Sequence, residues 1–248
     1  MLTGAFACAL AEESDMAYVT GKGTLVVGIT DFAPMDYQNA DGEWIGFDAD
    51  MARAVAADLG VEAQFIEIDW DNKILELDNK SIDVVWNGMT LTDEVKNSME
   101  CTNPYLNNAQ VIVVPADKAA SITDPSQASG LKFAVEAGSA GEAAAADYNY
   151  DFTAVTSQAD AVMEVAAGTS DACIIDSLMA GAMVGDGTSY SNLACTTVEL
   201  TSEEYGVGCR KGSDLAGYVN DQFKSLYNDG TLMSLAEKYG VQYAVLPQ

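Results

Sequence analysis

The feature that most restricts the fold is an alternation of short apolar runs with segments of helical periodicity. Residues 25–29 form a β-branched run of strand length. Apolar residues then recur every four positions from Met51 to Leu59, between Asp48 as a helix N-cap and Gly60 as a stop. Further strands are expected at 62–68, 83–86, 111–114, 131–135, 171–175 and 205–210, and further helices at 71–79, 158–167, 214–227 and 232–239. Strands that alternate with helices predict an α/β protein with parallel sheets.

A change of composition after Pro115 divides this pattern into two units. The sequence becomes rich in Ala, Ser and Asp before a new strand begins. We therefore predict two lobes, the first from residues 21–113 plus 206–248 and the second from residues 114–205. The connectors of this two-strand hinge are expected to be the strand at 111–114 on the way out and the strand at 205–210 on the way back. Ligands of open α/β sheets bind beyond the carboxyl ends of the strands, so a site is expected in the cleft between the lobes.

Residues 1–20 are expected to be a signal-peptide remnant and a flexible terminus. Residues 1–11 are uncharged and end in Ala9-Leu10-Ala11, which is typical of an export cleavage site, although a terminus without function is the alternative. Cys8 as a lipidated cysteine is a further alternative. Disulfides among Cys101, Cys173, Cys195 and Cys209 would suit an exported protein, with three connectivities open, but Cys173 and Cys209 lie in apolar runs that equally favour buried thiols.

Composition excludes several classes of function. The chain has no histidine, so Ser-His-Asp and Cys-His nucleophiles and most zinc, copper and iron sites cannot be built. We expect no metal, no cofactor and no enzymatic activity. The formal net charge of −27 disfavours nucleic acid and anionic lipid as partners. It does not identify a ligand, because long-range fields are screened beyond about 10 Å.

The order and spacing of several segments resemble the exported solute-binding proteins of amino-acid ABC importers. The matching segments are 25–28, 32–35, 46–50, 68–71, 82–92, 104–105, 138–139, 170–176 and 204–207. The resemblance implies a monomeric, two-lobed protein of the periplasm or extracellular space. It would close over one small solute and deliver it to the permease subunits of an importer in the membrane.

The resemblance also implies which residues line the pocket. Phe32 and Trp70 would form apolar walls, Asn87, Gly88 and Thr90 would donate hydrogen bonds from the first lobe, and Gly138 and Ser139 would donate from the second. Asp176 would hold the ligand's ammonium group. The remaining pocket positions are Met89 and Ala140, with Asp31, Glu136 and Lys73 as additional candidates. Four alternatives stay open: Phe32 and Trp70 as core residues, Asp176 as a helix cap and Glu136 as an exposed surface acid.

One position departs from the family pattern in a way that bears on the ligand. The family carries an arginine three residues after a threonine, where it clamps the ligand's α-carboxylate. Here Thr92 is followed at that spacing by Val95, and Lys96 comes one residue too late to face the same way on a helix. The ligand is thus expected to be a cationic or amine-bearing solute. Alternatively, its carboxylate is held by backbone N–H groups or by a basic residue such as Lys73 or Arg210.

Two other functions remain open from the sequence. Some relatives of this family are exported dehydratases or lyases, so an enzyme on the same scaffold is one alternative. An extracellular sensor module that captures a ligand for a partner protein is the other. Turnover of a prephenate-like substrate would favour the first.

Overall fold

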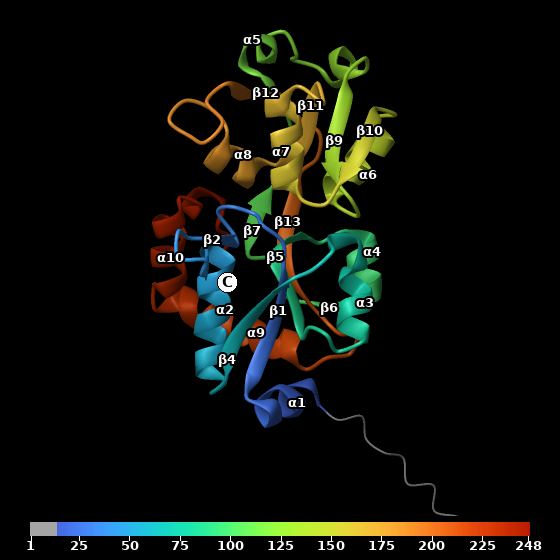
Figure 1. Cartoon of the computed structure of the whole chain (residues 1–248). Helices are drawn as coiled ribbons and strands as arrows, with labels where there is room; N and C mark the ends of the chain where they lie inside the picture. The colour runs from blue at the N-terminus through green and yellow to red at the C-terminus, as the bar shows by residue number, and fades with distance from the viewer. Residues whose placement is uncertain (1–13) are drawn as a thin grey trace, which may run out of the picture.

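The computed structural model of the chain describes residues 14–248 and has two lobes, one above the other in Figure 1. Each lobe contains a mixed sheet with helices on its faces, and the chain passes from the first lobe to the second and back. Fold class and two-lobed organisation were therefore predicted correctly from the alternation of strands and helices. No helix in the range 14–248 combines the length and apolar character needed to cross a membrane.

The first lobe is built on a sheet with the order β4-β1-β5-β13-β6, in which β7 also pairs with β13. β1 runs parallel to β4 and β5, whereas β13 is antiparallel to its neighbours. The strands are β1 (Thr24–Ile29), β4 (Glu62–Glu67), β5 (Val84–Thr90), β6 (Glu100–Cys101), β7 (Leu106–Asn108) and β13 (Glu203–Cys209). The helices are α1 (Asp15–Lys22), α2 (Phe47–Asp58), α3 (Lys73–Asp78), α4 (Asp93–Ser98), α9 (Leu215–Asn228) and α10 (Thr231–Tyr239). A small hairpin, β2 (Tyr37–Gln38) with β3 (Trp44–Ile45), and two short 3-10 helices, η1 (Trp70–Asn72) and η3 (Gln242–Ala244), complete the lobe.

The second lobe has the sheet order β10-β9-β11-β8-β12. β9 is parallel to β10 and β11, and β8 is antiparallel to β11 and β12. Its strands are β8 (Gln110–Pro115), β9 (Lys132–Glu136), β10 (Asp151–Val155), β11 (Ala172–Asp176) and β12 (Leu193–Glu199). Its helices are α5 (Ala116–Ala119), η2 (Pro125–Ala128), α6 (Ala140–Asp147), α7 (Gln158–Ala167) and α8 (Ser177–Met183).

The chain crosses between the sheets earlier than the sequence predicted. β8 already belongs to the second sheet at Gln110, so the predicted lobe boundary after residue 113 is a few residues too late. The return crossing likewise precedes β13, which joins the first sheet at Glu203, before the predicted boundary at 205/206. Residues 111–114 are uniformly apolar because β8 lies between β11 and β12 inside the second lobe, not because they form a connector.

Two elements begin or end differently from their prediction because of buried polar contacts. α2 starts at Phe47 with Gly46 as its N-cap, at φ +135°, where a Cβ would lie 2.0 Å from the Met35 carbonyl oxygen. Asp48 is therefore inside the helix and fully buried, not its cap. β5 continues past Trp86 to Thr90, because buried carboxylates accept hydrogen bonds from its polar segment.

The described part of the N-terminus is a helix, which corrects the prediction of a flexible segment up to residue 20. α1 is held to the first lobe by an ion network at the end far from the second lobe (Figure 1). Arg210 pairs with Asp15 at 2.9 Å and with Asp83 at 3.3 Å, and Lys22 pairs with Asp83 at 2.6 Å. Cys8 and the predicted cleavage site lie outside the described residues.

Cys101, Cys173, Cys195 and Cys209 are free thiols. Cys173 and Cys195 align with Val113 from opposite sides of β8, which places their strands roughly 9–10 Å apart. This separation exceeds the roughly 4.4–6.8 Å between Cα atoms that a disulfide spans. Cys101 aligns with Gly208, so Cys209 points to the opposite face of the sheet. The alternative of buried thiols therefore holds for Cys173 and Cys209.

Replacing Arg210 with Met should destabilise the protein by about 3–5 kcal/mol, because two buried carboxylates would lose their shared cation. Urea denaturation measures this loss in the free energy of unfolding. The matched control is Lys238→Met, which removes a largely exposed partner of Asp50 and should cost less than about 1 kcal/mol. Equal losses in the two variants would contradict the role of the ion network.

Candidate functional site

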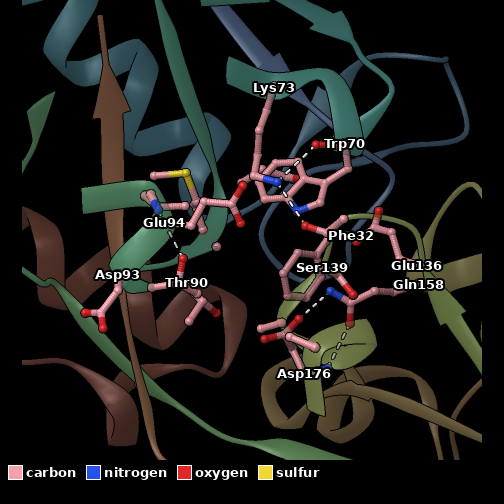
Figure 2. A pocket seen from close by; sticks show the side chains of 18 residues that line it. Phe32, Trp70, Lys73, Thr90, Asp93, Glu94, Glu136, Ser139, Gln158 and Asp176 are labelled. Atoms are coloured by element: carbon pink, nitrogen blue, oxygen red, sulfur yellow. Dashed lines mark hydrogen bonds between the residues drawn. The ribbon is translucent and has the colours of Figure 1, made fainter. Parts of the chain in front are cut away.

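A cavity of about 280 Å³ lies between the lobes, where the carboxyl ends of strands from both sheets meet. Ligand pockets occupy roughly 300–1,000 Å³, so this one suits a solute no larger than an amino acid. Figure 2 shows the side chains that surround it. The lining residues are Phe32, Trp70, Lys73, Asn87, Gly88, Met89, Thr90, Thr92, Asp93, Glu94, Val95, Glu136, Gly138, Ser139, Ala140, Ala143, Gln158 and Asp176.

Two aromatic side chains form the apolar wall of the first lobe. Phe32 and Trp70 both line the cavity although they are almost fully buried, so each is at once a core and a pocket residue. Phe32 makes an edge contact with Tyr205 at a ring separation of 6.4 Å. Gly88 leaves the room for this pair, because a Cβ there would lie 2.6 Å from the Phe32 ring and 3.0 Å from the Tyr205 ring.

The polar groups of β5 that were predicted to donate to a ligand are engaged within the protein. The Asn87 amide donates to the Thr30 carbonyl and to Asp36, and its oxygen accepts from Thr30. The Gly88 N–H donates to Asp48 at 2.6 Å. The Thr90 hydroxyl donates to Glu203 at 2.9 Å. These residues therefore fix the shape of the first-lobe wall, together with the buried Met89.

The second-lobe wall begins at the N-terminus of α6. Ser139 caps this helix by accepting from the Glu142 N–H, and the Gly138 N–H donates to the Glu142 carboxylate at 2.7 Å. Ala140 adds a methyl group to this wall. This small-residue turn lets the second lobe come close to the first.

The lobes touch across the cavity at the same turn. The Lys73 ammonium of the first lobe donates to the Gly138 carbonyl at 2.9 Å, as the dashed line in Figure 2 shows. A Cβ at Gly138 would lie only 2.7 Å from the Asp71 Cα, and φ at Gly138 is +69°. The structure is thus a closed arrangement in which Gly138 lies at a close contact between the lobes.

Asp176 lines the cavity at the end of β11 but is heavily hydrogen-bonded by the protein. Its carboxylate accepts from Asn108, Gln158, Gln110 at 3.0 Å and the Tyr205 hydroxyl at 2.7 Å. Burial, together with the nearby charge of Glu203, raises the pKa of Asp176 to about 7, against the effect of these donors. Although Asp176 stands at the N-cap of α8, its side chain makes no capping bond, so the helix-cap alternative is wrong.

The cavity contains more acidic than basic groups. Lys73 is its one cation among the described residues, whereas Asp93, Glu94, Glu136 and Asp176 all line it. Burial lowers the pKa of Lys73, and the carboxylates around it, Glu94 foremost, oppose that shift. Glu136 is 2% exposed, which corrects the surface-acid alternative, and burial raises its pKa to about 8.

Three charged candidates lie elsewhere. Asp31, in the bend that follows β1, lines a separate groove with Glu67 and Tyr37. Arg210 is bound in the ion network between α1 and the first sheet and cannot reach a ligand in the cavity. Lys96 lies on the exposed side of α4, as its spacing predicted.

Sequence reasoning missed several residues that line the cavity. Asp93 and Glu94 follow the Thr92 cap of α4, and Gln158 begins α7. The Thr92 motif could have indicated Asp93 and Glu94. They share the first turn of α4 with Val95, whose position in the family contacts the ligand. Gln158 carried no signal, since its contact with Asp176 joins residues from different elements of the second lobe.

A closed cavity between two α/β lobes linked by two crossings defines the class of solute-binding proteins. Residues 25–242 match the bacterial extracellular solute-binding proteins, family 3, and the chain belongs to that family.

Named relatives agree with this class. The L-cystine-binding protein TcyJ of Escherichia coli is 30% identical, over 96% of this chain and 91% of its own length. An L-arginine-binding protein of Pseudomonas aeruginosa is 30% identical, over 84% of each chain. A solved structure of an ancestral amino acid-binding protein, described as a precursor of cyclohexadienyl dehydratase, is 32% identical with a TM-score of 0.83, over 91% of this chain and 99% of that one.

Replacing Gly138 with Ala should weaken ligand binding by tenfold or more, because the methyl group meets the Asp71 backbone only when the lobes are closed. Small-angle scattering should show a larger radius of gyration, and calorimetry the lost affinity. The control is Gly130→Ala, where a Cβ meets nothing within 4 Å. An unchanged radius and affinity in the Gly138 variant would exclude this contact as a condition of closure.

Proposed function

We propose that the protein captures an amine-bearing solute of amino-acid size between its lobes and delivers it to the permease subunits of an ABC importer. The observation that carries this proposal is the charge of the cavity, in which four carboxyl groups line the wall against a single lysine. A desolvated carboxylate needs a cationic or hydrogen-bonding partner, and an ammonium or guanidinium group supplies both. The aromatic faces of Phe32 and Trp70 add cation–π attraction.

A carboxylate on the solute is not required in this proposal. Val95 occupies the position of the family's clamping arginine and is 4% exposed on the cavity wall. Lys73 could meet a carboxylate only with the part of its ammonium not already donated to the Trp70 and Gly138 carbonyls. An amine without a carboxylate therefore fits the cavity at least as well as an amino acid.

The proposed setting follows from the family. We place the protein outside the cytoplasm, in the periplasm or the extracellular space, with the permease as its membrane partner. We propose that the protein acts as a monomer. We further propose that the solute is bound without turnover, which the names of the curated relatives support. A dehydratase-like enzyme is the second candidate, because Glu136 is a buried acid in the cavity and one relative precedes a dehydratase.

Matched pairs of solutes test the ligand class. Arginine against agmatine and lysine against cadaverine differ only in the carboxylate, and we expect each pair to bind within about tenfold in isothermal calorimetry. Neutral amides of the same length should bind at least 100-fold more weakly, because they leave the acidic wall unpaired. NMR of the recovered solute should show no chemical change. Binding of the amino acids alone would exclude the amine proposal, and conversion of prephenate would favour the enzyme.

Replacing Val95 with Arg should restore the family's carboxylate clamp. We expect the variant to prefer arginine over agmatine by at least ten times more than the parent does, because a bidentate pair then forms with the carboxylate. Competition calorimetry measures this ratio. Val95→Leu is the size control and should leave the ratio unchanged. An unaltered ratio in the arginine variant would mean that the solute does not approach α4.

A further inference from the structure

Glu136 is a buried carboxyl with an unused acceptor in the wall of the cavity. It ends β9, it is 2% exposed, and its Oε1 atom has no hydrogen-bond partner. Figure 2 shows it beside Phe32 and Gln158 on the second-lobe side of the cavity. A buried oxygen without a donor is costly, so a donor arriving with a ligand would satisfy it.

Asp176 is the other buried acid of the same wall, and it differs in this respect. Its two oxygens already accept from four side chains, so its acceptor positions are occupied before any ligand arrives. Three of these donors, from Asn108, Gln110 and Tyr205, lie on the strands next to the two crossings. Asp176 is thus tied to the region that joins the lobes, whereas the Oε1 atom of Glu136 has no donor within the protein.

The surroundings of Glu136 favour a cation at this position. Asp176 and Lys73 are the charged groups that act most strongly on it, and Thr30 and Gln158 are its polar neighbours. The charge of Glu94 acts on Lys73 from the same lobe. Lys73 already donates two hydrogen bonds to backbone carbonyls, and its charge acts on Glu136 without a salt bridge between the two side chains. The carboxyl therefore lies in an acidic cavity with no cation of its own.

We propose that Glu136 accepts a hydrogen bond from the cationic nitrogen of the solute and is the residue by which the second lobe selects an ammonium or guanidinium group. The proposal rests on the proposed function and deepens it. Asp176, in contrast, positions the wall from the hinge region and is not the primary counter-ion. When the lobes close, the solute nitrogen supplies the donor that Oε1 lacks, so recognition of the cation and closure of the second lobe occur together.

The test compares agmatine binding to the parent protein and to Glu136→Gln at pH 8.5. The variant keeps the side-chain shape and removes the negative charge, and we expect affinity to fall by about 10- to 100-fold, the range of a charge-assisted hydrogen bond. Glu136→Asp keeps the charge and should recover part of the loss. Glu199→Gln is the matched control, because it makes the same change at an exposed position of the second lobe and should stay within twofold of the parent.

The pH dependence separates recognition from a structural role. Burial raises the pKa of Glu136 to about 8, so agmatine, whose guanidinium stays charged, should bind more tightly to the parent as pH rises from 7 to 9. Asp176, with a pKa of about 7, and Lys73, whose pKa is lowered, also titrate near the cavity and remain in the variant. The gain between pH 8 and 9 should therefore shrink in Glu136→Gln but persist in Glu199→Gln.

Stability of the ligand-free protein gives a second readout that does not depend on binding. A carboxyl whose pKa is higher in the folded than in the unfolded state contributes stability at low pH that is lost as pH rises through that interval. The Gln variant lacks this loss, so at pH 9 its melting temperature should exceed that of the parent. A melting temperature below that of the parent at pH 9 would contradict an unpartnered carboxyl.

The two levels of the proposal fail in different ways. If agmatine and cadaverine do not bind the parent protein at all, the proposed ligand class is wrong and the role of Glu136 falls with it. If they bind the parent and the Glu136 variants equally well, with the same pH profile, the ligand class stands and the assignment to Glu136 is overturned.

Discussion

The arrangement of the two lobes depends on one buried network in which two carboxylates share the same amides. Asn108 and Gln110 each donate to both Asp176 and Glu203. These amides flank the first crossing between the lobes, and Glu203 begins the strand that follows the return crossing. The network therefore connects both crossings to Asp176 in the cavity wall. The geometry of the crossings and the position of Asp176 are thus fixed by the same hydrogen bonds.

The two lobes use their polar groups differently at the site. The hydrogen-bond donors of the first lobe are used within that lobe. Asn87 donates to the buried Asp36 and the Gly88 N–H to the buried Asp48, which fixes the wall. The second lobe offers a glycine turn for contact and a carboxyl with an open acceptor. A rigid apolar surface on one side and an unpartnered acceptor on the other favour a closed complex, because the acceptor gains a donor only when a solute fills the space between them.

Much of the fold and part of the site could be predicted from the sequence. Periodicity located the central strands of the two sheets and the longest helices, since burial on both faces of a strand leaves an apolar run. It missed β6, β7, β10 and β12, which are short or partly exposed, and the shorter helices α1, α4, α5, α6 and α8. It placed Asp48 at a helix cap and 111–114 in a connector, because local patterns do not reveal a buried carboxylate or the sheet that a strand joins. The family resemblance predicted Phe32, Trp70 and Asp176 in one pocket, and all three line the cavity. It could not show that internal donors already bind the Asp176 carboxylate or that Asp31 lines a separate groove, since both follow from contacts between distant segments.

The position of α1 has a mechanical consequence. This helix is bonded through Asp15 and Lys22 to the end of the first lobe that is farthest from the second lobe. Force applied through the chain at residue 14 would therefore be carried by the ion pairs of Arg210 and Asp83, without loading the crossings at 108–110 and before 203. Attachment to a surface at this end and movement of the lobes are thereby uncoupled, and an anchored molecule would open and close as freely as one in solution.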